Sequence, residues 1–225
     1  MTTHTDRDAK PPRAPLSKER VLRAAMGLAD KEGLESLTMR RLGQKLGVEA
    51  MSLYNHVANK DDLLDAMVDI AFSEIDLSSN GADWKAIMRR RAMSAREMLA
   101  RHPWAVGLME SRATAGPANL RHHDSVIGSL RKGGFSIEMA AHAYSVMDSY
   151  IYGFALQQMT LSVGARRQAP EEAQTFLGRF RAEEYPYLTE MVTEYAMKSG
   201  YDYADEFEFG LDLILNGLER LRDAA

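Results

Sequence analysis

The 225-residue chain contains no cysteine, so it can form neither a disulfide framework nor a thiolate metal site. It also lacks any window approaching the roughly 18 unbroken apolar residues of a membrane-spanning helix. The first residues, MTTHTDRDAKPPRAP, are polar, include three prolines and lack the apolar stretch of a secretory signal. We therefore expect residues 1–16 to be a flexible arm and the protein to be cytoplasmic.

Sequence motifs of common enzyme chemistry are also missing. The chain has no phosphate-binding loop, dinucleotide-binding glycine pattern, nucleophile elbow or paired-histidine zinc helix. His122 and His123 are adjacent and precede Asp124, but neighbouring helical residues point about 100° apart and rarely bind one ion. We expect this pair on a solvated face, His142 buried on an apolar helix, and His102 in a local turn. The sequence predicts no enzyme activity, no metal site and no cofactor.

Charge is distributed unevenly along an otherwise ordinary globular composition of 45% hydrophobic and 27% charged residues. Residues 1–60 carry 11 Lys and Arg against 7 Asp and Glu, a net charge of +4. Residues 61–225 carry 17 against 25, a net charge of −8. A basic N-terminal part on an acidic body indicates that only the N-terminal part meets a polyanion, although chance also produces such a split.

Apolar residues recur with helical period in nearly every segment, and no convincing strand alternation is present, so the sequence predicts an all-α protein. Ser17 can cap a first helix that Gly33 ends, and Thr38 can cap a second, short helix that Gly47 closes. A third short helix is expected at Ala50–His56. Further helices are expected from about Asn59 onward and at Trp84–Arg101, Trp104–Arg112, Pro117–Lys132, Ile137–Ser162, Glu171–Glu183, Tyr187–Lys198 and Tyr203–Arg222.

Two short helices joined by a tight turn at Gly47 form the pattern of a helix-turn-helix. Leu42, Leu46, Val48 and Leu53 have the spacing to hold the two helices together. In this motif the second helix lies in the major groove of DNA while the first crosses the phosphate backbone. The helix pair alone would also fit ordinary core packing without DNA contact.

The second of these helices carries side chains suited to reading DNA. Ser52 and Asn55 can hydrogen-bond base edges, and Ala50 or Met51 can touch a thymine methyl group. An inward orientation of Met51 and Tyr54 stays open. Residues that suit phosphate contacts carry a hydroxyl group, an imidazole or a positive charge: Thr38, Arg40, Arg41, Tyr54, His56 and Lys60.

The segment LTMRRLGQKLGVEAMSLYNHVANKDDLLDAM resembles the DNA-binding segment of the tetracycline-repressor (TetR) family, with dense similarity over about residues 17–75. Farther along, ARHPW, GGFS and FEFGLDLILNGLER resemble the C-terminal domain of the branch that contains the tetracycline repressors. The resemblance implies a ligand-released repressor that binds a roughly palindromic operator in double-stranded DNA as a homodimer. It also implies that the two heads are set apart to meet successive major grooves.

These observations together predict an N-terminal three-helix helix-turn-helix head joined to a larger helical domain for ligand binding and dimerisation. We assign residues 1–16 to the arm, 17–62 to the DNA-binding domain and 63–225 to the C-terminal domain. The stretch DLSSNGAD, from Asp76 to Asp83, is the most loop-like boundary candidate.

Two expected helices of the body, 137–162 and 203–222, carry apolar residues around more than one face, so each must be buried on two sides. The resemblance implies that the two helices pack against their copies as a four-helix bundle. An internal core helix of a monomer is the alternative. The apolar residues of the last helix that fit the bundle are Phe207, Leu211, Ile214, Leu215 and Leu218.

Methionines and aromatic side chains of the body could line a deformable ligand pocket, although at helical spacing they also fit plain core. The inducer is unknown. The residues expected near such a cavity are Trp104, Met109, Arg112, Tyr144, Asp148 and Tyr152.

Tetracycline–magnesium is not the expected inducer. Tetracycline repressors hold the chelate with two histidines and a glutamate. An ungapped alignment places those positions at Asp76, at Leu108 or Met109, and at Gln157. All three differences remove a contact that the chelate needs.

The proposed mechanism is a population shift in which ligand favours a form whose heads no longer fit both half-sites, with the helix near 59–75 as the lever. The rival hypothesis is a helical ligand- or partner-binding protein without DNA-binding activity. Activation instead of repression also stays open.

Overall fold

The computed structural model describes residues 15–78, 81–111, 116–164, 177–179, 181–198 and 201–224. Within these ranges the chain is helical and has no strand, which confirms the all-α prediction. None of the helices described has the length and hydropathy needed to cross a membrane. The chain divides into two compact units, one ending at Leu63 and the other beginning at Leu64.

The first unit contains α1 (Lys18–Glu32), α2 (Met39–Leu46), α3 (Ala50–Leu53) and the start of α4 (Lys60–Ser73), with a 3-10 turn at Leu34–Ser36. Ser17 Oγ accepts the Arg20 amide at 3.2 Å, and Thr38 Oγ1 accepts the Arg41 amide at 3.2 Å. Both caps satisfy backbone donors that a helix start leaves unpaired. The predicted starts of the first two helices are therefore confirmed.

The core of this unit is formed by apolar side chains from all of its helices. Burying a Val, Leu or Met side chain contributes about 1.5–3 kcal/mol relative to leaving it exposed, and an alanine contributes less. The buried set comprises Val21, Leu22, Ala25, Met26, Leu28, Ala29, Leu37, Leu42, Leu46, Leu53, Val57 and Leu63. Three of the four residues that the sequence pattern singled out, Leu42, Leu46 and Leu53, belong to this core, whereas Val48 is half-buried. They help to hold α2 against α1 and α3 against α2.

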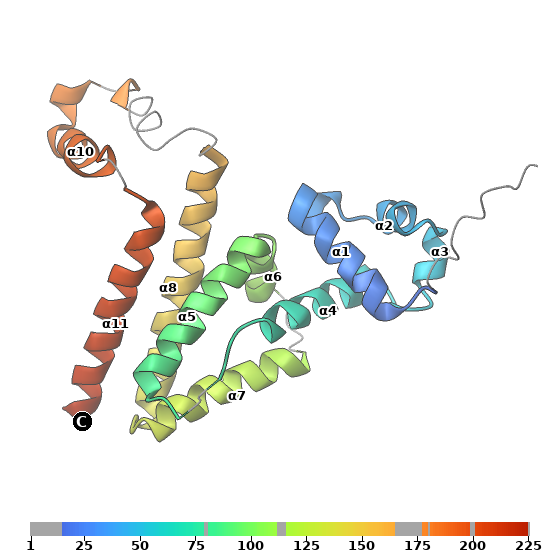
Figure 1. Cartoon of the computed structure of the whole chain (residues 1–225), viewed down its shortest axis with the longest axis horizontal. Helices are drawn as coiled ribbons and strands as arrows, with labels where there is room; N and C mark the ends of the chain where they lie inside the picture. Colours follow the sequence, from blue (N-terminus) through green and yellow to red (C-terminus); the bar gives the residue numbers. More distant parts are fainter. Residues whose placement is uncertain are drawn as a thin grey trace, which may run out of the picture. The chain divides into compact units, whose positions relative to one another are not determined.

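The second unit is built mainly from α5 (Trp84–Arg101), α6 (Ala105–Ser111), α7 (Pro117–Lys132), α8 (Ile137–Gly164) and α11 (Glu206–Asp223). Figure 1 shows α8 and α11 running alongside α5, and residues of these three helices contact one another. Their shared core includes Met88, Met98, Met147, Phe207 and Leu211.

Between α8 and α11 the structure describes only part of the chain. The helix expected at Glu171–Glu183 falls mostly outside the described residues, which here begin again at 177. A 3-10 turn (Ala182–Glu184) precedes α10 (Pro186–Met191). The helix expected at Tyr187–Lys198 starts as α10 and continues as a π-helical segment, Val192–Ala196. A further 3-10 turn (Tyr203–Asp205) leads into α11.

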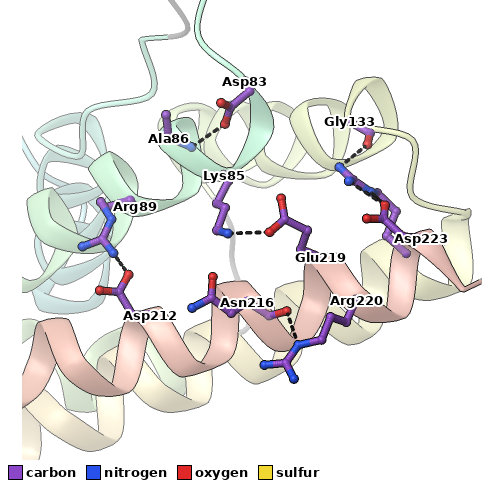
Figure 2. A network of polar contacts seen from close by, with 11 residues as sticks. Asp83, Lys85, Ala86, Arg89, Gly133, Asp212, Asn216, Glu219, Arg220 and Asp223 are labelled. Carbon is purple, nitrogen blue, oxygen red and sulfur yellow. Dashed lines mark hydrogen bonds and ion pairs between the residues drawn. The ribbon is translucent and has the colours of Figure 1, made fainter.

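Ion pairs join α5 to α11 at the edge of this core (Figure 2). Lys85 Nζ lies 2.6 Å from Glu219 Oε2, and Arg89 pairs with Asp212. All four side chains retain part of their exposure to water. Water screens such pairs, so each contributes at most about 1 kcal/mol. The apolar core, not these pairs, holds the two helices together.

Two histidine predictions are wrong. His122 is completely buried instead of lying on a solvated face, because its ring is enclosed between α5 and α4 and bonded to Arg91. His142 is exposed instead of buried: it lies on the outer side of α8, with Nε2 3.9 Å from a carboxylate oxygen of Glu138. Apolar neighbours in the sequence indicate that a helix is buried somewhere, but they do not indicate which of its sides.

Candidate nucleic-acid interface and ligand site

The turn between α2 and α3 is shaped by two glycines. Gly47 adopts a left-handed conformation (φ 70°) and its amide donates to the carbonyl of Gln44 at 3.2 Å, which ends α2. Gly43 faces the backbone of the next segment: a Cβ there would lie 2.9 Å from the Val48 carbonyl oxygen and 3.2 Å from the Ala50 amide nitrogen. The two helices therefore approach more closely than any side chain at position 43 would allow.

The segment 50–56 is presented to solvent. Met51 is 74% exposed and Tyr54 is 42% exposed, so neither is packed inward. Asn55 is exposed, while Ser52 and His56 are half-buried, as is Ala50. The regular helix ends at Leu53, and 54–56 form a turn. Side chains able to bond a base edge or touch a thymine methyl group thus share one outward surface.

The residues suited to phosphates lie around this segment. Arg40 is exposed at the start of α2, and Thr38 Oγ1 is engaged in capping that helix. Arg41 is already paired with Glu32, so a phosphate must share or displace that carboxylate. Lys60 is exposed in the first turn of α4. Positive side chains and the N-terminus of a helix both favour a phosphate group.

Capping also fixes the start of α4. Asn59 Oδ1 accepts the Asp62 amide at 2.8 Å, and Asp62 Oδ2 accepts the Ala58 amide at 2.9 Å. This reciprocal arrangement satisfies two backbone donors and orients the chain entering the helix. It therefore positions Lys60, which lies between the two capping residues.

A polar cluster lies inside the second unit, where α5, α7 and α8 meet. Arg91 of α5 is 1% exposed; its Nε donates to His122 Nε2 at 3.0 Å, and its Nη2 donates to Asp148 Oδ1. The guanidinium carbon Cζ of Arg91 lies over the Tyr144 ring, 5.7 Å from the ring centroid. The Tyr144 hydroxyl is 3.4 Å from His123 Nε2. Ionised groups this deep in a protein persist only when paired, as Arg91 and Asp148 are.

Burial changes the protonation of this cluster. Desolvation, together with the positive charge of Arg91, lowers the pKa of His122 to about 3, so its ring is neutral at pH 7. Desolvation also lowers the pKa of His123, and it raises that of Tyr144, where the Asp148 carboxylate acts in the same direction. The cluster therefore carries one positive and one negative charge at pH 7.

The structure brings together only some of the residues predicted near a cavity. Tyr144 and Asp148 belong to the buried cluster. Trp104 is buried with its ring centroid 5.6 Å from that of His102, while Met109 and Tyr152 are half-buried. Arg112 lies outside the described residues.

Sequence analysis missed Arg91 and His122 as members of this cluster. Arg91 lies at helical spacing from the apolar residues Ile87, Ala95 and Met98, so it shares their side of α5. A charged residue on an apolar side of a helix indicates a buried, paired charge, and this signal was present in the sequence.

Two pockets lie in other parts of the second unit. One, of about 260 Å³, is lined by Arg131, Gly134, Phe135, Ser136, Met139 and Arg222. The other is a more open groove of about 410 Å³ lined by Leu156, Gln157, Thr160 and Tyr203. Gln157, one of the three positions at which the chain differs from tetracycline repressors, is hydrogen-bonded by the Tyr203 hydroxyl. None of the residues predicted near a cavity lines either pocket.

Large apolar side chains remain exposed on α8 and α11. On α11 they are spaced four and then eight residues apart, so they lie on one side of the helix: Phe209 is 65% exposed, Leu213 58% and Leu221 58%. On α8, Val146 and Leu156 are about half exposed. The residues of α11 that the resemblance assigned to a dimer bundle lie mostly within the chain itself. Ile214 is half-buried, and the other four are buried: Phe207, Leu211, Leu215 and Leu218. The face available to a partner is thus the other side of α11.

The chain has a helix-turn-helix head in which the segment 50–56 is exposed, and a larger helical unit follows the head. This arrangement is that of the helix-turn-helix transcription regulators. Comparison with known families specifies the class further. Residues 21–67 match the family described as "Bacterial regulatory proteins, tetR family", and residues 77–222 match "Tetracyclin repressor-like, C-terminal domain". The chain belongs to the TetR family of DNA-binding transcriptional regulators.

Individual relatives agree with this assignment. The chain is 32% identical to the HTH-type transcriptional repressor DrrR1 of Streptomyces coeruleorubidus, over 96% of this chain and 82% of that protein. It is 29% identical to the class C tetracycline repressor protein of Escherichia coli, over 92% of each. Among solved structures it is similar to Streptomyces coelicolor ActR in complex with actinorhodin, with a TM-score of 0.75, 29% identity, and coverage of 93% of this chain and 99% of that one.

Proposed function

We propose that this protein is a repressor that binds a palindromic operator as a homodimer and is released by a small molecule. Residues 17–62 would act as the DNA-binding domain and residues 63–225 as the ligand-binding and dimerisation domain, in the cytoplasm where its DNA lies. The observation that carries the proposal is the exposed segment 50–56, held outward by the glycine-shaped turn of a TetR-family head. The relatives support repression, since one is named a repressor and ActR was crystallised with a small molecule.

A gel shift with a palindrome from the protein's own promoter region tests DNA binding directly. Phosphate-dominated binding is expected to weaken steeply with salt, because each phosphate contact releases counterions. An intact, folded protein that shifts no such fragment at low salt would favour the rival hypothesis of a helical protein without DNA-binding activity.

Asn55 is the residue whose removal should most clearly change base preference. Its amide can bond an adenine edge with two hydrogen bonds, and its side chain is exposed. Asn55→Ala is expected to weaken binding to the best operator by about 1–3 kcal/mol and to reduce discrimination between operator variants. A competition assay over operators altered one base pair at a time measures both effects.

Lys60→Ala is the matched control for that measurement. A phosphate contact carries no sequence information, so its loss should weaken all DNA sequences about equally and lower the salt slope by roughly one unit. If Asn55→Ala instead behaves like Lys60→Ala, with discrimination unchanged, Asn55 does not read a base.

Dimerisation through α8 and α11 is supported by their exposed apolar face. Leu213→Glu places a charge in the middle of the exposed stripe of α11, and we expect it to convert a dimer to a monomer. Size-exclusion chromatography with light scattering measures the change. Leu120→Glu is the control, because Leu120 of α7 is similarly exposed (59%) but belongs to neither helix. An unaltered dimer in Leu213→Glu contradicts this interface.

A route from ligand to DNA is provided by contacts of α4 with α7. Asp69 Oδ1 accepts the amides of Ala118 at 2.7 Å and Asn119 at 3.0 Å, and so caps the N-terminus of α7. The Phe72 ring centroid lies 5.2 Å from that of His122. We infer that a ligand which shifts α7 also shifts α4, the helix that begins at the DNA-binding head, and thereby favours a form with lower operator affinity.

The inducer is not expected to be tetracycline–magnesium. Asp76 is bonded through its amide to Ser94 Oγ at 2.9 Å, and Gln157 is engaged by Tyr203. Asp76 does not supply the imidazole, and Gln157 does not supply the carboxylate, that tetracycline repressors use at these positions. Titration of the purified protein with tetracycline and magnesium should show no binding in the micromolar range, and magnesium-dependent binding there would refute the expectation.

A further inference from the structure

The pocket of about 260 Å³ lies where α7 ends, α8 begins and α11 ends. Half of its lining comes from the segment GGFS, residues 133–136, which has no part in DNA binding or in the proposed dimer. Backbone hydrogen bonds hold this turn: the Gly134 amide donates to the Arg131 carbonyl at 3.1 Å, and the Phe135 amide donates to the Leu130 carbonyl at 3.2 Å. The pocket is therefore built on a fixed piece of backbone.

Two arginines that line the pocket reach this turn from different helices. Arg131 of α7 donates through Nη1 to the Phe135 carbonyl oxygen at 2.5 Å, and Arg222 of α11 donates through Nη1 to the Gly133 carbonyl oxygen at 3.2 Å. The guanidinium carbon of Arg222 also lies over the rings of Trp84 and Phe135, 5.5 and 5.9 Å from their centroids. These contacts hold both guanidinium groups at the pocket before any ligand binds, so little side-chain freedom remains to be lost on binding.

The charges around the pocket do not balance. Asp223 pairs with Arg222, since its Oδ1 lies 2.6 Å from Nη2 (Figure 2). No carboxylate pairs with Arg131 in the part of the chain that the structure describes, and Glu138, in the first turn of α8, does not line the pocket. A hollow that gathers charge of one sign against apolar walls raises the local concentration of ions of the opposite sign.

The start of α8 adds further donors. Ser136 caps this helix, because its Oγ accepts the Met139 amide at 3.1 Å. The hydroxyl hydrogen of Ser136 has no acceptor among the described residues. The amides of residues 137 and 138 have no acceptor within the helix, and the N-terminus of a helix favours an anion. Three separate elements therefore bring hydrogen-bond donors to one hollow.

A phosphate group suits this set of donors better than a carboxylate does. Guanidinium groups pair with either anion through parallel hydrogen bonds. A carboxylate has two oxygens in one plane, whereas the tetrahedral oxygens of a phosphate group can accept from all three elements at once. A phosphate monoester also carries a charge of about −1.5 to −2 at pH 7, which balances Arg131 together with the helix terminus.

We propose that this pocket binds a phosphate group, either inorganic phosphate or the phosphate of a small monoester, through Arg131, Arg222 and the start of α8. The site is separate from the buried Arg91 cluster, none of whose residues lines the pocket. The inference goes beyond the proposed function and does not depend on it, because the site belongs to the second unit whether or not the head binds DNA.

Calorimetric titration of the full-length protein at pH 8 and constant ionic strength tests the proposal with inorganic phosphate and with acetate. Phosphate is expected to bind saturably with a Kd of about 1 mM or below, and acetate at least about tenfold more weakly. A third titration with glycerol 3-phosphate distinguishes the two sources of the phosphate group. Binding about tenfold tighter than that of inorganic phosphate identifies a phosphorylated small molecule, whereas equal or weaker binding identifies inorganic phosphate.

Arg131→Gln removes the guanidinium group that no described carboxylate balances. It is expected to weaken phosphate binding about ten- to a hundredfold, as the loss of a hydrogen bond from a charged donor implies. Lys132→Gln is the matched control, because it removes the same charge from the next residue, which is also exposed but does not line the pocket. Its affinity for phosphate is expected to change by less than about threefold, since water and salt screen a charge outside the site.

Several results overturn the proposal. They are an absence of saturable phosphate binding up to about 10 mM, acetate binding as tight as that of phosphate, and full affinity in Arg131→Gln. Equal losses in Arg131→Gln and Lys132→Gln also refute it, because they show a general effect of net charge and not a site. If Arg131→Gln does not fold, the comparison of phosphate with acetate on the unaltered protein decides.

Discussion

Asp148→Leu alone is expected to lower the free energy of unfolding by about 3–5 kcal/mol, the largest effect we predict for a single side chain in the second unit. The substitution leaves the charge of Arg91 buried and unpaired, since that side chain is 1% exposed. Denaturant unfolding monitored by circular dichroism measures the loss.

Two further variants isolate the cause. The double variant Arg91→Met with Asp148→Leu should recover most of the lost stability, because it leaves no charge behind. Glu219→Gln, which breaks the partly exposed pair with Lys85, should cost no more than about 1 kcal/mol. If Asp148→Leu is no more destabilising than Glu219→Gln, the interior pair contributes nothing and Arg91 must reach water.

Gly43→Val is expected to disable the head. Its Cβ would stand 2.9 Å from the carbonyl oxygen of Val48, a backbone atom that cannot rotate away, so α2 and α3 must separate. Overpacking of this kind costs about 1–3 kcal/mol of stability. The separation displaces the whole segment 50–56, so all of its contacts with the bases are lost at once. Operator affinity should therefore fall about a hundredfold or more, beyond the loss from any single contact.

Gly27→Ala is the matched control in the same unit. Position 27 is inside α1, and a Cβ there would meet only Lys45 Nζ, at an ordinary 3.7 Å. Alanine should stabilise this helix by roughly 0.5–1 kcal/mol and leave operator binding unchanged. A Gly43→Val protein with normal operator affinity would show that the close approach of α2 and α3 is not required for DNA binding. Thermal unfolding and the gel shift together measure the two variants.

Local signals explain why the head could be predicted in detail. Ser17 and Thr38 cap the helices that follow them, and Gly47 ends α2 in the left-handed conformation. Each of these features depends on a few consecutive residues. The outward surface of 50–56 follows from the same logic, because Leu53 is the only residue of α3 that the core takes up.

The buried polar cluster of the second unit could be predicted only in part. Tyr144 and Asp148 were among the residues expected near a cavity, and both belong to the cluster. Arg91 and His122 were not found, although they complete the same cluster. Their contacts join residues 31 and 57 positions apart in the chain, and no local pattern reports such a distance.

The amino-acid sequence by itself determined the helices, their caps, the turn of the helix-turn-helix and membership of the family. All of these depend on residues that are close together in the sequence. Tertiary structure alone decided which side of α11 enters the core, which histidine is buried, and which side chains pair with the buried Arg91. A helical repeat shows that a face is apolar but not what covers it. A buried charge depends on partners that folding brings from elsewhere.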